Sequence, residues 1–424
     1  MKLSELITEI KEGRKDEALI ELYGAEDLAA QQERYISVIQ KTIDLFSDQE
    51  GCIFSAPGRT EVGGNHTDHQ LGRVLAAGIN LDTIAAVIPT DDNKIRLASR
   101  GFSIKPVDIS DLSIDINEKN TTESLIRGVC AGLNERGYKV GGFMAYSESN
   151  VIAGGGMSSS AAFEVLLGTI ESGLYNNFAV SAEDIAKIGQ YAENVYFMKA
   201  SGLMDQMASS VGSFVAIDFF DKDNPVIEKV DFNPADYNVD LILTDVRASH
   251  ADLSDEYSAI PTEMKGVAKI LGETVLSRCT VDQLMANVAK IRENLGDRAF
   301  LRAYHFLKET VRAREEAEAL REKDINRFFR LVRESGQSSW MYLQNICPPG
   351  SRKEQPVAVG LMLSDAVLGE EGAYRVHGGG FAGTIQAFVP KEKTEAYIKA
   401  MESAFGEGAC YILRIRSKGG TQVM

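Results

Sequence analysis

A dense group of polar side chains lies between Ser55 and Gly78, in the segment SAPGRTEVGGNHTDHQLGRVLAAG. Polar groups that converge near tight turns can hydrogen-bond a polyhydroxylated ligand, and carboxylates are good acceptors for sugar hydroxyls. A solvated hairpin loop is an equally good interpretation of this segment alone. A metal site is disfavoured because nothing elsewhere completes a ligand set at standard spacing. The candidate residues of this cluster are Arg59, Glu61, Asn65, His66, Asp68 and His69.

A second cluster is the segment AGGGMSSSAA, from Ala153 to Ala162. The glycines Gly154, Gly155 and Gly156 allow the backbone to approach a ligand closely. The serines Ser158, Ser159 and Ser160 are predicted to open a helix, whose unpaired N–H groups and dipole favour an anion. A flexible turn before an ordinary capped helix explains the same residues. The Walker A ending G-K-[ST] does not occur in the sequence, so a nucleotide site here must be of another type.

A third cluster runs from Tyr191 to Gly212, where Asp205 follows Gly202 among apolar neighbours. Partial burial raises the pKa of a carboxyl from about 3.9, which suits a general base. An ordinary acid at a helix N-terminus is the alternative. Glu193, twelve residues earlier, provides a second carboxylate.

A fourth cluster, from Arg375 to Val389, contains Gly378, Gly379 and Gly380. These glycines would let the chain pass close beneath another glycine-rich loop. A β-bulge or a tight corner is an equally good interpretation.

The elements around these clusters form a mixture of strands and helices. Apolar, β-branched runs predict paired strands within 74–88 and single strands at 211–219 and 239–246, and 387–390 closes another strand. A helix follows the second cluster, and two surface helices are expected over 309–335, the second capped by Asp324. No regular βαβ alternation is present, so the pattern predicts an α+β fold rather than a Rossmann sheet. A domain boundary is expected between 210 and 225.

Length and charge limit the function further. The 424 residues suggest two or three domains. The net charge of −16 argues against nucleic acid or an anionic membrane as a partner, although a local site can still bind an anionic small molecule. The apolar run 74–89 is interrupted by Asn80 and Asp82, the five cysteines are widely scattered, and the N-terminus does not resemble a signal peptide. A soluble, cytoplasmic protein is expected.

Together and in order, the four clusters resemble the galactokinase branch of the GHMP small-molecule kinases. Residues 55–68 are similar to the family signature APGRxNLIGEHTDY, and 156–162 to the GLSSSAA phosphate loop. Residues 192–193 with 202–206 resemble AEH followed by CGIMDQ at the same spacing, 378–381 resembles GGGFGG, and 250–257 resembles HSLASSEY. The resemblance spans nearly the whole chain.

This resemblance implies two α+β domains, 1–215 and 216–424, with the active site in the cleft between them. It implies transfer of the γ-phosphoryl group of ATP to the anomeric hydroxyl of a hexose, with galactose as the first choice. Asp205 would take or orient the hydroxyl proton, and Arg59 would stabilise charge on the transferring phosphoryl group. A monomer or weak dimer is expected.

The remaining roles are also carried over from the resemblance, position by position. The glycines and serines of the second cluster would bind the nucleotide phosphates, with Ser159 and Glu193 as ligands of Mg²⁺. The three glycines of the fourth cluster would form the third family motif. The sugar would be contacted by Asn65, His66, Asp68, Gly202 and Tyr257.

One departure from the family pattern bears on the substrate. Asn65 stands where galactokinases carry a Glu that faces the sugar 6-hydroxyl. Loss of that charge leaves galacturonate, L-arabinose and N-acetylgalactosamine as alternatives to galactose. A non-catalytic sensor of sugar and nucleotide is a further alternative, disfavoured because Arg59, Asp205, Glu193 and the serine triplet are all retained.

Overall fold

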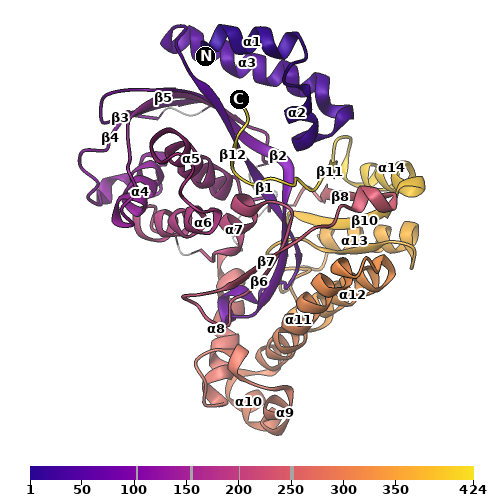
Figure 1. Ribbon diagram of the computed structural model, residues 1–424. Coiled ribbons are helices and arrows are strands. Elements are labelled where there is room, and N and C mark those ends of the chain that lie inside the picture. The colour runs from indigo at the N-terminus through magenta and orange to yellow at the C-terminus, as the bar shows by residue number, and fades with distance from the viewer. Residues whose placement is uncertain (102–103, 153–155, 200, 249–252) are drawn as a thin grey trace.

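The computed structural model describes residues 1–101, 104–152, 156–199, 201–248 and 253–424, and it contains two β-sheets flanked by helices (Figure 1). Among these residues, the larger sheet has eight strands, with β12-β1-β2-β5-β3-β4 in order, β6 paired with β2, and β7 paired with β6. Its strands are β1 (Cys52–Gly63), β2 (Arg73–Pro89), β3 (Lys94–Ser99), β4 (Val107–Asp108), β5 (Phe143–Ser149), β6 (Phe214–Asp218), β7 (Val226–Val230) and β12 (Thr421–Gln422).

Strand β2 organises this sheet. The expectation of paired strands within 74–88 is wrong, because these residues form one strand of 17 residues. The first part of β2 pairs with β6, the second part pairs with β5, and β1 runs along both parts. The pairing of β1 with β2 shifts register between Pro57 and Arg59 and again between Glu61 and Gly63. Such irregularities redirect side chains, and here they occur within the first polar cluster.

Alternating residues of β1 and β2 enter two different cores. Phe54, Ala85 and Val87 pack with α4 (Thr122–Glu135), α5 (Ser159–Asn176) and α6 (Ala182–Tyr191). Ile53, Ile84 and Ala86 pack with α1 (Leu3–Lys11), α2 (Asp16–Tyr23) and α3 (Leu28–Phe46). The sheet is therefore covered by helices on both faces, as Figure 1 shows.

The smaller sheet has four strands in the order β11-β8-β10-β9. The strands are β8 (Val239–Asp245), β9 (Ala373–Val376), β10 (Thr384–Pro390) and β11 (Cys410–Leu413). Helices α13 (Pro356–Leu368) and α14 (Thr394–Phe405) pack on one face, and α11 (Asp297–Arg321) and α12 (Ile325–Ser338) bury apolar side chains on the other. Helices α8 (Ser254–Ile270), α9 (Val281–Ala286) and α10 (Val288–Leu295) form an arm at the bottom of Figure 1.

Most of the expected elements are confirmed, with small differences in their bounds. The α+β class is confirmed, and the Asp324 side chain accepts a hydrogen bond from Arg327 N at 2.9 Å and so caps α12. The helices over 309–335 are not simply surface helices, because Glu309, Glu316 and Phe328 are fully buried. The strand expected at 211–219 begins only at Phe214, since α7 (Met204–Val211) occupies the preceding residues.

The division into domains 1–215 and 216–424 stays a prediction. The larger sheet includes β7, which ends at Val230, and β12 near the C-terminus returns to pair with β1. One core contains residues of both sheets, among them Val62, Leu75 and Phe388. The two sheets are therefore joined by shared packing as well as by the chain.

The N-terminal helices are tied to the larger sheet by the buried carboxylate of Asp82. Arg34 Nη1 lies 2.7 Å from Asp82 Oδ1, Arg416 Nη1 lies 3.0 Å from Oδ2, and Tyr23 and Ser55 also donate to it. Burial alone would raise the pKa of Asp82, but the two guanidinium groups and these hydrogen bonds hold it below its usual value.

Replacing Asp82 by Ala is expected to lower the free energy of unfolding by about 3–5 kcal/mol, because it leaves buried arginines without their counter-charge. Urea denaturation of the full chain measures this loss. Asp91→Ala, at an exposed position of the following turn, is the control and should change stability little. Equal stabilities of the two variants would contradict the assigned role of Asp82.

Candidate active site

Arg59 and Asp205 meet in a two-pronged ion pair. Arg59 follows the first register shift of β1, and Asp205 lies in the first turn of α7. Arg59 Nε donates to Asp205 Oδ1 at 2.7 Å and Nη2 donates to Oδ2 at 2.8 Å. This geometry fixes the orientation of both side chains. The structure therefore brings together the two residues that the sequence predicts to be catalytic.

The electrostatics of this pair differ from the expectation for an isolated buried carboxyl. Burial raises the pKa of Asp205, but the charge and hydrogen bonds of Arg59, together with a hydrogen bond from Ser158, outweigh it. The net pKa lies below the usual value, so Asp205 is ionised at neutral pH. The expectation of a net raised pKa is thus wrong, because Arg59 supplies a matched counter-charge that outweighs the effect of burial.

The second and fourth clusters contact each other beside this pair. Arg59 Nη1 donates to the carbonyl oxygen of Gly156, and helix α5 begins at Ser159. Gly156 has φ +70°, and a methyl group at this position would lie 3.0 Å from His377 Nδ1. A methyl group at Gly378 would lie 4.0 Å from Gly156 Cα. The predicted nucleotide residues Gly154 and Gly155 lie outside the described residues.

His377 joins these loops to the first cluster as a neutral imidazole. Burial and the nearby charges of Arg59 and Arg375 lower the pKa of His377 well below its usual value. Its Nε2 accepts from Glu61 N at 3.3 Å, so Nδ1 carries the proton and donates to Thr384 Oγ1 at 2.9 Å. His377 directly precedes the three glycines of the fourth cluster.

The predicted sugar residues His66, Asp68, Gly202 and Tyr257 lie along the same loops. A methyl group at Gly202 would lie 2.4 Å from Asp68 Oδ2, so any larger residue here would have to displace the Asp68 carboxylate. Burial and nearby carboxylates raise the pKa of Asp68, although His66 opposes this shift. His66 Nε2 lies 3.0 Å from Gly379 O, and Tyr257 donates to Gly380 O at 2.9 Å. Two backbone carbonyl groups of the fourth cluster thus contact two of these side chains, those of His66 and Tyr257.

Asn65 differs from the other predicted sugar residues because its amide is completely buried. Its Nδ2 donates to Glu61 Oε1 at 2.8 Å and to Gly378 O at 2.7 Å. Its Oδ1 accepts from Asn345 Nδ2 at 2.9 Å and from Ser339 Oγ at 3.2 Å. An amide group has two donors and two acceptor positions, so the protein itself satisfies all four. Sugar contact by Asn65 stays a prediction, and this rotamer offers no unused hydrogen bond for it.

Buried charges surround Asn65, and sequence reasoning missed most of them. Arg375 Nη2 lies 2.9 Å from Glu61 Oε1, and His305 Nε2 lies 3.0 Å from Asn65 O. Burial would raise the pKa of Glu309, but nearby cations, with Arg312 first among them, lower it to about 2. For His305, Glu309 and Arg312, the sequence signal is that charged and polar residues interrupt the apolar face of α11.

Glu193 is a buried carboxylate near Asp205. It lies on η4 (Ala192–Tyr196), a π-helical turn of a kind often found at functional sites. Its Oε1 accepts from Ser160 Oγ at 3.3 Å and lies 2.8 Å from Lys199 Nζ. Its Oε2 accepts from Gln206 Nε2 at 3.0 Å. A carboxylate and a hydroxyl oxygen that already attract a cationic group fit the oxygen preference of Mg²⁺.

The serine beside Glu193 is Ser160, whereas Ser159 is the predicted metal ligand. Ser160→Ala is therefore expected to raise the Mg²⁺ concentration needed for half-maximal activity, by about tenfold for a lost oxygen ligand. Ser159→Ala, one residue away on the same helix turn, is the matched control and should have a smaller effect. The measurement is a Mg²⁺ titration of the phosphotransfer rate. A larger effect for Ser159→Ala would restore the original assignment.

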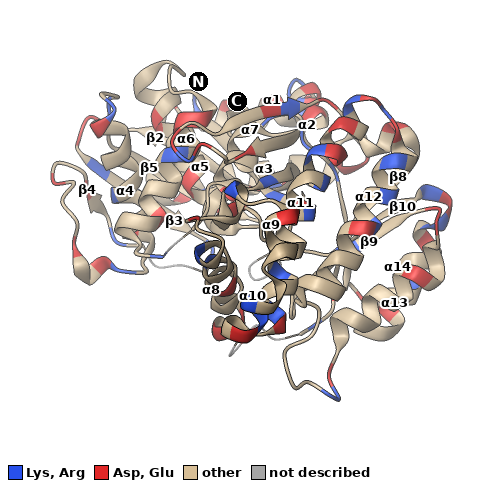
Figure 2. Cartoon of the chain, turned by 90° about the horizontal axis from the view of Figure 1, so that it is seen from below, with Lys and Arg blue, Asp and Glu red and all other residues tan. Residues whose placement is uncertain are grey.

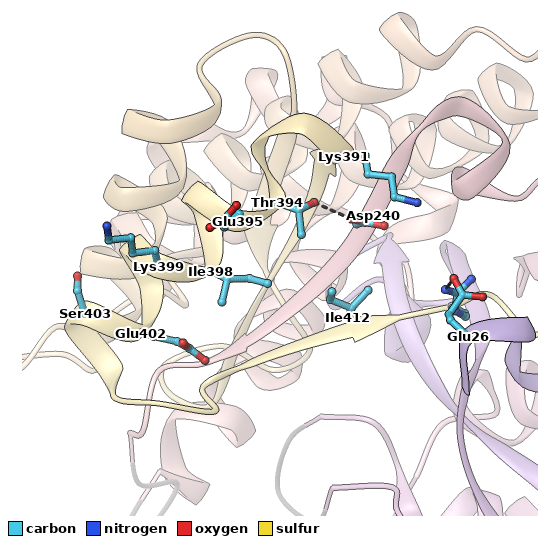
Figure 3. A pocket seen from close by; sticks show the side chains of 11 residues that line it. Glu26, Asp240, Lys391, Thr394, Glu395, Ile398, Lys399, Glu402, Ser403 and Ile412 are labelled. Carbon is cyan, nitrogen blue, oxygen red and sulfur yellow. Dashed lines mark hydrogen bonds and ion pairs between the residues drawn. The ribbon is translucent and has the colours of Figure 1, made fainter. Parts of the chain in front are cut away.

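The surface features of the molecule outside this region do not overlap the site around Arg59 and Asp205. A groove of about 950 Å³ lies between α14 and β11 and is lined by charges of both signs, among them Glu402 and Lys399 (Figure 3). In the view of Figure 2, acidic and basic residues alternate over the helices and do not gather in one patch.

Within the described part of the chain, no group of three or more His, Cys, Asp or Glu side chains is arranged as a metal cage, and no helix has the length and apolar character to cross a membrane.

Two family models match the chain. Residues 43–89 match the galactokinase galactose-binding signature, and residues 124–213 match the GHMP kinases N terminal domain. These ranges contain the first two clusters, Glu193 and Asp205.

Solved structures share the fold at low sequence identity. Galactokinase from Lactococcus lactis, in complex with galactose, is 22% identical with a TM-score of 0.77, over 90% of this chain and 98% of that chain. Mevalonate kinase from Methanococcus jannaschii is 15% identical with a TM-score of 0.61, over 86% and 98%. A D-glycero-D-manno-heptose 1-phosphate kinase from Bacteriodes thetaiotaomicron is 15% identical with a TM-score of 0.58, over 87% and 98%.

Residues 124–213 thus match the N-terminal domain of the GHMP kinases, and the fold is shared with a solved galactokinase. Residues 43–89 match the galactokinase galactose-binding signature as well, and the resemblance to galactokinases inferred from the four clusters is confirmed. The chain is accordingly a phosphotransferase that acts on a sugar hydroxyl.

Proposed function

We propose that the protein transfers the γ-phosphoryl group of ATP to the anomeric 1-hydroxyl of galactose. The observation that carries this proposal is the two-pronged Arg59–Asp205 pair, with Arg59 also bonded to the carbonyl of Gly156 in the phosphate loop. One cation and one carboxylate thus lie where the nucleotide loop meets the sugar signature.

Asp205 orients the sugar hydroxyl and accepts its proton late in the reaction. The transition state of phosphoryl transfer is loose, so the attacking hydroxyl needs little deprotonation before bond formation. A carboxylate with a lowered pKa is a weak base, but it suits this role because it stays ionised and fixed in place. Arg59 holds Asp205 in position and faces the negative charge that spreads over the transferring oxygens.

The nucleotide phosphates bind at the start of α5. The first N–H groups of a helix have no intrahelical partners and attract anions, and Ser158, Ser159 and Ser160 add hydroxyl donors. Glu193 and Ser160 would hold Mg²⁺ beside these phosphates. When bound, the ion neutralises charge on the phosphate oxygens during transfer.

The sugar is held by Asp68, His66 and Tyr257 next to Gly202. Asp68 lies against Gly202, and Gly202 precedes Asp205 by three residues in the chain. A sugar bound to Asp68 therefore has a hydroxyl near the carboxylate of Asp205. The match to the galactose-binding signature supports galactose as this sugar.

A substrate panel tests the proposal. The full chain is assayed for ADP release with galactose, N-acetylgalactosamine, galacturonate and L-arabinose, and the product is identified by ³¹P NMR. The expected result is a sugar 1-phosphate formed fastest from galactose. Absence of turnover with galactose would refute the substrate, and tight binding of sugar and ATP without ADP release would indicate a sensor instead of an enzyme.

A further inference from the structure

Lys199 lies beside Glu193 in the candidate active site, but the proposed reaction gives it no role. Its Nζ is 2.8 Å from Glu193 Oε1, the same oxygen that accepts from Ser160 Oγ. The Glu193 side chain is 4% exposed, whereas that of Lys199 is 58% exposed. A buried carboxylate is therefore neutralised by an ammonium group whose stem lies mostly in solvent.

The backbone fixes Lys199 at this place. Lys199 N donates to Glu193 O at 3.0 Å, which folds the chain back onto the π-helical turn. Met198, just before it, has φ +63°, a left-handed conformation that is costly for a side chain of this size. The ion pair thus follows from a defined turn and is not a chance meeting of two surface side chains.

The other charged groups nearby leave Glu193 dependent on Lys199. Arg59 is engaged by both oxygens of Asp205. Gln206 Nε2 donates to Glu193 Oε2 and, at 2.9 Å, to Glu164 Oε2. Glu164 Oε1 has no hydrogen-bond partner among the described residues. The surroundings of Glu193 therefore contain several hydrogen-bond acceptors and few cationic groups.

We propose that Lys199 and a divalent cation compete for Glu193, and that Lys199 moves to the nucleotide phosphates when the cation takes its place. The proposal rests on the proposed function. A cation held by Ser160 and Glu193 would share Oε1 with the ammonium group, and two positive charges repel each other at that distance. The flexible lysine stem can turn toward the adjacent start of α5, where the phosphates bind, and lysine is a common phosphate ligand.

Two binding measurements with opposite expected signs test this. Manganese binding is followed by the loss of the free Mn²⁺ EPR signal, without nucleotide, in the full chain and in Lys199→Met. Nucleotide binding is followed by calorimetry with an ATP analogue that is not hydrolysed, in the presence of Mn²⁺. Lys199→Met is expected to bind Mn²⁺ tighter and the analogue more weakly, each by about fivefold, the change that a partly exposed ion pair gives.

Two further variants keep the test specific. Lys199→Arg retains the charge and should stay near the wild type in Mn²⁺ binding. Lys187→Met removes a lysine from α6 that has no contact with Glu193 among the described residues, and it should change neither affinity. Thermal unfolding of each variant confirms that the fold is intact.

The remaining outcomes separate this inference from the proposed function. Unchanged or weaker Mn²⁺ binding by Lys199→Met, or no Mn²⁺ binding by either protein, would overturn the competition. Unchanged affinity for the analogue would overturn the phosphate contact. If both shifts occur but no sugar is phosphorylated, the inference about Lys199 stands and the proposed kinase reaction fails.

Discussion

Replacing Asp205 by Asn is expected to lower kcat for sugar phosphorylation by about 10³-fold, within the range for loss of a proton acceptor. The amide is nearly isosteric, so the sugar should still bind to Asp68, His66 and Tyr257. The amide cannot accept a proton from the 1-hydroxyl. It also loses the charge that holds Arg59, whose Nε and Nη2 both donate to this carboxylate. The variant therefore removes the proton acceptor and loosens the cation at once.

A surface pair provides the matched control for this variant. Arg73 Nε lies 2.7 Å from Asp218 Oδ2, and both side chains are partly exposed. Asp218→Asn thus breaks an Arg–Asp pair outside the site and should leave kcat unchanged. Turnover is measured by ADP release, and sugar affinity by calorimetry. A kcat for Asp205→Asn within tenfold of the wild type would show that Asp205 is not the proton acceptor.

The pH dependence of turnover should report the same pair. Arg59 lowers the pKa of Asp205 below the usual carboxyl value, so the group stays ionised as the pH falls from 8 to 5. The wild-type kcat/KM should not fall in that window through Asp205. In Arg59→Met, the largest influence that lowers the pKa of Asp205 is lost and only the weaker ones of Ser158 and Lys199 still oppose burial. The pKa of Asp205 rises, so the acid limb should move to higher pH. An acid limb at the same pH in both proteins would contradict this coupling.

The sequence predicts the main elements of the site but not their contacts. The order and spacing of the four clusters suffice to select Arg59 and Asp205, and the structure places them within hydrogen-bond distance. Whether Ser159 or Ser160 faces Glu193 depends on how α5 is turned about its axis. The helix follows Ser158, whose backbone is in the left-handed conformation, and no local sequence pattern predicts that conformation. The sequence also does not predict that β2 is one long strand, because the polar residues Asn80 and Asp82 interrupt its apolar run.

Asn65 shows most clearly why the rest could not be predicted. Asn65 is hydrogen-bonded to Ser339, Asn345 and Gly378, which all lie far from it in the sequence. No single sequence motif includes Asn65 and these three residues. Only tertiary packing brings them to the first cluster. The comparison of Asn65 with a family Glu identifies the position as unusual, but the burial of the amide depends on these distant segments.

Replacing Asn65 by Asp is expected to destabilise the fold by about 3–5 kcal/mol, the range for a buried charge without a partner. Two N–H donors disappear, and Glu61 Oε1 and Gly378 O then face a carboxylate instead of an amide. The two hydrogen bonds to Asn65 Oδ1 can persist, so the loss concentrates on the Glu61 side. Urea denaturation measures the effect. Asn294→Asp is the control, because that exposed amide donates to a helix carbonyl at the surface.

The loss in Asn65→Asp should depend on pH with a definite sign. Burial and the adjacent Glu61 raise the pKa of the new carboxyl in the folded state, so the folded protein binds its proton more tightly than the unfolded chain does. The part of the destabilisation that is due to ionisation is therefore absent below the pKa of the unfolded chain, about 3.9, and grows as the pH rises. The stability difference from the wild type should shrink between pH 7 and pH 4. A difference that stays constant over this interval, or a variant as stable as the wild type at pH 7, would mean that position 65 faces solvent or substrate and not the Glu61–Gly378 junction.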